Sequence, residues 1–167
     1  ELNDLEKKNS SQLKIFIFLS NEKFNVNVDK LIELIKAIKN LNNVNFSISP
    51  HPRSGISGFD KNLFHNILNN SNARVISREI DIGIIYGTSI AHHFLLKKIP
   101  FIVPKFIDNN ENIYDLHKVC YAPKNQNDLL NFIKDFSRNE YFSSEMNTNI
   151  EKFINYFVYG NSSYKQL

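Results

Sequence analysis

Short apolar runs alternate along the chain with longer amphipathic segments, and this alternation predicts a sheet covered by helices. The run LKIFIFL (residues 13–19) is rich in Ile and Phe and predicts a buried strand. In residues 27–41 the apolar side chains recur every three or four positions, which predicts an amphipathic helix. Residues 44–49 (VNFSIS) then predict a second strand.

The same alternation continues toward the C-terminus. It predicts strands at 73–77, 81–87, 100–104 and 118–122. It also predicts helices at 60–70, with Asp60 as N-cap, at 88–98, and two closing helices at 125–139 and 143–160. Strands that alternate with helices favour βαβ units. We therefore expect an α/β fold, with a Rossmann-like parallel sheet and helices on both faces. The expected domain spans residues 13–160, between a linker or tail at 1–12 and a C-terminal tail at 161–167.

Composition narrows the class of protein and the kind of partner. The chain has 167 residues, enough for one domain with a core, and a net charge of +3 from scattered lysines, so nucleic acid is not an expected partner. A single cysteine excludes an internal disulfide and fits a reducing compartment. No apolar run approaches the roughly 20 residues of a membrane span. We expect a cytoplasmic protein, with peripheral association at the inner face of the membrane left open.

The stretch SPHPRSG follows the predicted strand 44–49 and carries the first candidate site, His51-Pro52-Arg53. The prolines at 50 and 52 stiffen the strand exit and so fix the direction of the neighbouring side chains. The Arg53 guanidinium offers a planar fork of donors suited to phosphate, and an imidazole can donate to a phosphate oxygen. The alternative is an ordinary solvated loop.

Gly87-Thr88-Ser89 forms the second candidate site, between a predicted strand and a predicted helix. The first turn of a helix presents unpaired N–H groups and a partial positive charge, which together attract anions. Gly87 allows a ligand to approach the backbone, and the two hydroxyls add donors. The alternative is plain N-capping. Both segments follow strands of one sheet, so both could face one crevice and bind a nucleotide phosphate.

Other polar residues make weaker candidates. His92 and His93 lack the spaced partners of a metal site, so we expect packing or solvent exposure there, and no metal. Cys120 is expected to be a buried small residue in an apolar strand. Asp108, Glu111 and Asp115 could touch a sugar or ribose, but a solvated loop is the preferred interpretation. No catalytic residue is assigned.

The combination of SPHPR with DIGIIYGTSIAHHFLLKKIPFIVP resembles the C-terminal, nucleotide-binding half of GT-B fold glycosyltransferases. It is closest in style to bacterial sialyltransferases, capsular Kdo transferases and CDP-glycerol transferases, and the likeness covers residues 14–103. In those groups a His-Pro motif and a later Ser/Thr pair hold the CMP or CDP part of the donor. The resemblance implies that role for His51-Pro52 and for Thr88-Ser89.

The resemblance also implies an activity: transfer of a nucleotide-activated sugar, with a CMP- or CDP-type donor, in surface polysaccharide, capsule or glycan synthesis. The donor would be a substrate, no metal or organic cofactor is implied, and the acceptor would be a glycan or a lipid-linked molecule. Many related transferases carry a ribose-binding Glu where alignment places His93, and this departure favours cytidine. The general base is expected in an N-terminal domain outside this sequence, so the chain should bind donor without turnover.

Two alternatives stay open at this point. The first is a UDP-sugar transferase or a nucleotide-sugar epimerase of the same fold. The second is a non-catalytic α/β interaction module, for which replacing His51 or Ser89 would change no ligand binding.

Overall fold

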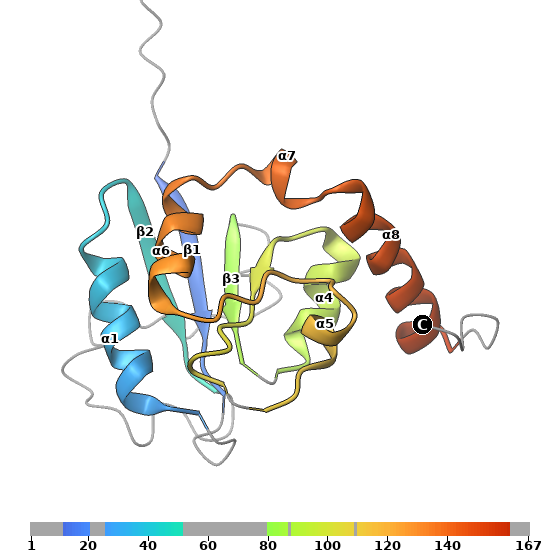
Figure 1. The fold of residues 1–167 in the computed structure, drawn as a ribbon, viewed down its shortest axis with the longest axis horizontal. Helices are drawn as coiled ribbons and strands as arrows, with labels where there is room; N and C mark the ends of the chain where they lie inside the picture. The colour runs from blue at the N-terminus through green and yellow to red at the C-terminus, as the bar shows by residue number, and fades with distance from the viewer. Residues whose placement is uncertain (1–11, 21–25, 52–79, 87, 109, 161–167) are drawn as a thin grey trace, which may run out of the picture.

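In the described part of the chain, four parallel strands form one sheet in the order β2-β1-β3-β4. The computed structural model describes residues 12–20, 26–51, 80–86, 88–108 and 110–160. The strands are β1 (Leu13–Phe18), β2 (Val44–Ser49), β3 (Ile82–Ile85) and β4 (Phe101–Ile102). The predicted α/β, Rossmann-like fold is confirmed, with helices interleaved between the strands (Figure 1).

Helices connect and cover these strands. They are α1 (Val28–Lys39), α4 (Ile90–Lys97), α5 (Ile113–Leu116), α6 (Gln126–Lys134), α7 (Arg138–Tyr141) and α8 (Ser144–Phe153), with a π-helical turn, η1 (Ile154–Val158), after α8. The predicted helices at 27–41 and 88–98 are confirmed. The predicted helix 125–139 instead ends at Lys134, and α7 follows as a separate short helix.

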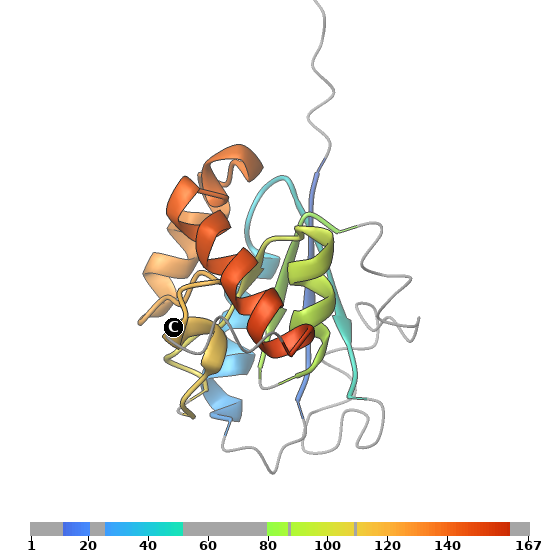
Figure 2. The ribbon, with the colours of Figure 1, turned by 90° about the vertical axis from the view of Figure 1, so that its right-hand side faces the viewer.

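One face of the sheet packs against α1 and α6, which lie together on one side of it in Figure 2. Alternate side chains of β1, Ile15 and Ile17, point to this face and are fully buried. They meet the apolar stripe of α1, whose buried side chains are Leu31, Leu34, Ile35 and Ile38. Full burial of each such side chain stabilises the fold by roughly 1.5–3 kcal/mol, so the period of the sequence decides which face of α1 packs inward.

The other face packs against α4, α5 and α8. Here Gly83 of β3 lies directly under the ring of Phe94, and a Cβ atom at position 83 would overlap that ring. A glycine in the middle of a strand therefore lets α4 approach the sheet closely. Phe94 in turn packs edge-on against Phe18 and beside Phe101. This packing fixes the direction in which α4 leaves β3.

The strand predicted at 118–122 is wrong. Only Tyr121 pairs with the sheet, through an isolated parallel bridge to Ile102. Beyond it, the hydroxyl of Tyr141 accepts a hydrogen bond from Phe101 N (3.1 Å) and donates one to Phe101 O (2.6 Å). A side chain thus satisfies backbone groups of the edge strand that a longer sixth strand would otherwise have paired.

Several predicted segments lie outside the described residues: the strand at 73–77, the helix at 60–70, and the tails 1–12 (apart from Gln12) and 161–167. Their assignments stay predictions. Among the described residues, no helix has both the length and the apolar character required to cross a bilayer.

Candidate functional site at the carboxyl ends of the strands

Strand order reverses at β1, and the edge of the sheet at the carboxyl ends of its strands is here called the crevice. From β1 the chain continues to β2 on one side, and it later returns to β3 on the other side. In open parallel sheets, ligands bind at the carboxyl ends of strands next to such a reversal. The strand ends at this crevice are those of β1, β2 and β3.

The structure places residues from both sequence motifs at this edge. Phe18, at the end of β1, is in register with Ser49 of β2 and with Ile85 of β3. His51 lies two residues beyond Ser49, and Thr88 lies three residues beyond Ile85. Because β1 separates β2 from β3, the two strand exits start about 10 Å apart, or two strand spacings. His51 is half-buried there.

Helix α4 begins immediately after this strand exit, and its N-terminus lacks the usual polar cap. Ser89 is the N-cap, but its side chain makes no capping hydrogen bond, and the first turn contains no acidic residue. The nearest substitute is a contact of 3.5 Å between Ile90 N and Thr88 Oγ1, too long for a strong hydrogen bond. The partial positive charge at this helix start is therefore not neutralised by the helix's own side chains.

The other long helices begin differently. A side-chain oxygen accepts from a first-turn amide in α1 (Asn27 to Lys30 N, 3.0 Å), in α6 (Asn125 to Asp128 N, 2.9 Å) and in α8 (Ser143 to Met146 N, 3.1 Å). Each also has an acidic residue in its first turn: Asp29, Asp128 and Glu145. Of these four helices, only α4 has neither a capping hydrogen bond from its N-cap side chain nor an acid in its first turn. Plain N-capping by Ser89 is not observed, and Thr88 makes only the long contact with Ile90 N.

The structure places His92 but not three of the predicted motif residues. Pro52, Arg53 and Gly87 lie outside the described residues, so their roles stay predictions. His92 packs edge-on against Tyr114, with ring centroids 5.7 Å apart, and beside Phe153 at 6.1 Å. Of the two outcomes expected for His92, packing or solvent exposure, the structure shows packing.

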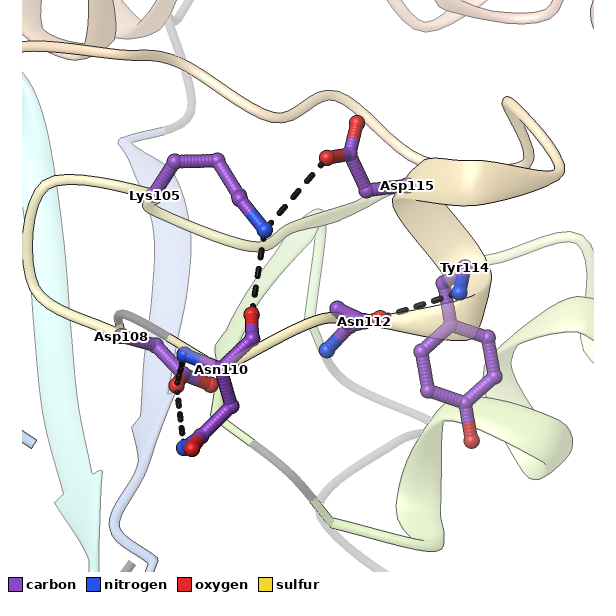
Figure 3. Close-up of polar contacts among 6 residues, drawn as sticks. All are labelled: Lys105, Asp108, Asn110, Asn112, Tyr114 and Asp115. Atoms are coloured by element: carbon purple, nitrogen blue, oxygen red, sulfur yellow. Dashed lines mark hydrogen bonds and ion pairs between the residues drawn. The ribbon is translucent and has the colours of Figure 1, made fainter. Parts of the chain in front are cut away.

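The loop after β4 is held by a set of polar contacts (Figure 3). Lys105 Nζ donates to Asn110 O at 3.1 Å and forms an ion pair with Asp115 at 3.5 Å. Asp108 Oδ1 accepts from both the backbone N (3.0 Å) and the side-chain Nδ2 (2.8 Å) of Asn110. Asn112 Oδ1 accepts from Tyr114 N at 3.0 Å and caps α5. These bonds hold the loop in one shape.

The expectation of a solvated loop is wrong for Asp108, which is only 2% exposed. Asp108 forms an antiparallel bridge with Val26, and Asn27 N donates to Ile107 O at 2.9 Å. The loop is therefore pinned against the start of α1, which buries the carboxylate. Glu111 is exposed as expected, and Asp115 is partly exposed in its ion pair.

Tyr86, the residue after β3, is a polar group that the sequence pattern did not single out. Its side chain is fully buried on the α1 face, and its hydroxyl has no hydrogen-bond partner among the described residues. Burial raises the pKa of Tyr86 strongly, and the negative charge of Asp108 adds to the rise. At the end of an apolar strand a Tyr looks like one more core residue, so only a specific search for strand-end polar groups could have found it.

A cleft of about 400 Å³ lies at the opposite edge of the sheet, between the amino ends of β1 and β2 and the end of α6. Its lining includes Asn43, Asp81 and Lys134. It is remote from the strand ends where the sequence motifs meet. Nowhere in the described ranges do three or more His, Cys, Asp or Glu side chains gather as metal ligands would.

Neither the family models nor the curated proteins compared with this chain give a match. The α/β assignment therefore rests on the strand order and register described above, and any assignment of function rests on the chemistry of the crevice.

Proposed function

We propose that this chain is the donor-binding domain of a glycosyltransferase that uses a nucleotide-activated sugar, with a CMP- or CDP-type donor favoured. The observation that carries the proposal is the start of α4, where Ser89 makes no capping hydrogen bond, Thr88 Oγ1 accepts only a long one from Ile90 N, the first turn has no acid and strand order reverses nearby. The placement of His51 at the same edge supports it. So does the resemblance of these two segments to the nucleotide-binding half of GT-B transferases.

The chemistry of sugar transfer fits this arrangement. When the glycosidic bond of the donor breaks, the leaving group is a nucleotide phosphate on which negative charge grows. Amides at a helix start and the hydroxyls of Thr88 and Ser89 would stabilise that charge where it develops. His51 would donate a further hydrogen bond to phosphate. The general base that activates the acceptor, a glycan or a lipid-linked molecule, would come from another domain.

A calorimetric titration with CMP, CDP, UMP, UDP and GDP tests the proposal, on the wild-type chain beside His51→Ala and Ser89→Asp. The aspartate adds a negative charge where the phosphate would bind. We expect cytidine nucleotides to bind, and Ser89→Asp to weaken them at least about tenfold through charge repulsion. His51→Ala should weaken them as well.

Ser143→Asp is the matched control, because it adds the same charge at the N-cap of α8, away from the crevice. It should leave nucleotide affinity unchanged. A preference for uridine nucleotides would favour the UDP-sugar alternative. If no nucleotide binds the wild-type chain, or if Ser89→Asp and Ser143→Asp behave alike, the proposed site is wrong.

A further inference from the structure

The cleft of about 400 Å³ at the amino ends of β1 and β2, here called the amino-end cleft, has a size typical of small-ligand pockets. Four segments that are far apart in the sequence line it: the start of β1, the turn between α1 and β2, the residue before β3, and the end of α6 with the residues that follow. None of these segments takes part in the proposed nucleotide site. The amino-end cleft is therefore a separate feature of the fold.

Backbone hydrogen bonds join three of the four lining segments. Leu13 N donates to Asn43 O at 2.8 Å, which ties the start of β1 to the turn before β2. Lys14 N donates to Asp81 Oδ2 at 2.8 Å, and Asp81 N donates to Lys14 O at 2.9 Å, which ties β1 to the residue before β3. The cleft thus exists in the folded chain as described, and a ligand can enter it without any bond being broken.

The polar side chains of the cleft have unused hydrogen-bonding capacity. Asn42, Asn43 and Lys134 are exposed, and within the described ranges their side chains make no hydrogen bond or ion pair. Asp81 is half-buried and uses Oδ2 to accept from Lys14 N, so that its Oδ1 has no hydrogen-bond partner among those residues. The cleft therefore presents two carboxamides, one carboxylate and one ammonium group.

The rest of the lining is apolar. It includes Leu13 and Phe136, which are half-buried and pack against the core cluster on the α1 face. The ring of Phe136 is supported edge-on by Phe132, with ring centroids 5.7 Å apart. A ligand that fits this cleft must carry an apolar surface beside groups that form hydrogen bonds.

The charges and the donors select among ligand classes. A phosphate is disfavoured, because the single cation Lys134 is offset by Asp81. A metal ion finds only one carboxylate, fewer oxygen ligands than Ca²⁺ or Mg²⁺ takes. A hydroxyl both donates and accepts, so adjacent hydroxyls can bind carboxamides, a carboxylate and an ammonium group alike. A sugar ring carries such hydroxyls together with patches of C–H groups that can cover apolar side chains.

We propose that the amino-end cleft binds a unit of a neutral glycan. Because β1 has six residues, the cleft and the crevice lie about 20 Å apart along the sheet. The cleft thus holds a part of the glycan that is remote from any reacting end. That this glycan is the molecule to which sugar is transferred rests on the proposed function, whereas the binding itself does not.

The test begins with an array of neutral and acidic oligosaccharides built from hexoses and N-acetylhexosamines, probed with the wild-type chain. We expect neutral glycans to bind. An NMR titration with the glycan that binds most tightly then locates the site. Backbone amide shifts should change at 41–44, 81 and 134, and those at 88–92 should stay unchanged.

Two variants measure the contribution of the polar groups. Asp81→Asn keeps an oxygen to accept from Lys14 N but removes the charge, and it should weaken the glycan at least about tenfold. Asn42→Ala changes an exposed side chain and should weaken it about fivefold. Asn127→Ala is the matched control, because Asn127 is an exposed residue near the start of α6 and outside the cleft lining. It should leave the affinity unchanged.

Three results would overturn the inference: no neutral glycan binds, only acidic glycans bind, or Asn42→Ala and Asp81→Asn bind the glycan as tightly as Asn127→Ala does. The nucleotide titration above is decided independently, since its variants lie at the other edge of the sheet. If the glycan binds at the amino-end cleft and no nucleotide binds the wild-type chain, the glycan site stands and the proposed function is wrong.

Discussion

Tyr86 and Tyr141 are both buried tyrosines beside the sheet, yet their hydroxyls have opposite surroundings. The Tyr141 hydroxyl accepts from Phe101 N and donates to Phe101 O, so it completes the edge of β4. The Tyr86 hydroxyl, at the end of β3, has no partner among the described residues. The first arrangement contributes to stability, whereas the second lowers it.

This difference separates a buried hydroxyl with two hydrogen bonds from a buried hydroxyl with none among the described residues. At β4 a side chain supplies the hydrogen bonds that a sixth strand would have made, and the local backbone is satisfied. At the end of β3 the fold buries a hydroxyl for which the described residues supply no hydrogen-bond partner. The same Tyr→Phe substitution should therefore have opposite effects at the two positions.

The largest expected effect is a loss of stability at alkaline pH. An unfolded tyrosine loses its proton near pH 10, whereas burial raises the pKa of both Tyr86 and Tyr141 in the folded chain. Above pH 10 the unfolded chain binds fewer protons than the folded chain, so the free energy of unfolding falls as pH rises. For the two groups together the slope should reach about 3 kcal/mol per pH unit. Urea unfolding at a series of pH values measures it.

Each single variant sharpens this comparison, because Tyr86→Phe and Tyr141→Phe each remove one titrating group. Each should lower the slope by about 1.4 kcal/mol per pH unit, the contribution of one titrating group, whatever its effect at neutral pH. A slope that neither variant changes would show that other groups govern the alkaline transition.

The next largest effect is that of Tyr141→Phe at neutral pH. It leaves Phe101 N without its acceptor inside the core, while Phe101 O keeps only the long contact of 3.4 Å from Tyr121 N. We expect a loss of about 2 kcal/mol in the free energy of unfolding. Denaturant unfolding measures it, with Tyr156→Phe as the control that should change little. A loss no larger than that of the control would contradict the role of Tyr141 at the sheet edge.

The smallest effect has the opposite sign. Tyr86→Phe keeps the ring in the core and removes a hydroxyl without a partner, so we expect a gain of about 1 kcal/mol in the free energy of unfolding. The same denaturant series measures it. If Tyr86→Phe and Tyr141→Phe destabilise the chain alike, the contrast between the two tyrosines is lost.

The sequence pattern predicted much of the fold because the apolar residues that are buried recur with the period of the strand or helix that carries them. The stripe of α1 and the strands at 13–19 and 44–49 follow directly from the spacing of apolar residues. The pattern was wrong at 118–122, where a run of similar character pairs only through Tyr121. There a hydroxyl from Tyr141, 40 residues beyond Phe101, completes the edge of β4. A local pattern carries no information about such a distant partner.

The candidate site also has one part that the sequence predicts and one part that depends on tertiary structure. The sequence by itself determined that a helix would begin after Gly87-Thr88-Ser89 with no acid in its first turn, since this depends only on neighbouring residues. Only the tertiary structure decided that Asp108 is buried and that its charge reaches Tyr86, 22 positions earlier in the chain. Parallel strands gather their exits at one edge whatever their separation in sequence, so the polar groups that meet there are set by strand order, which a pattern of apolar residues does not encode.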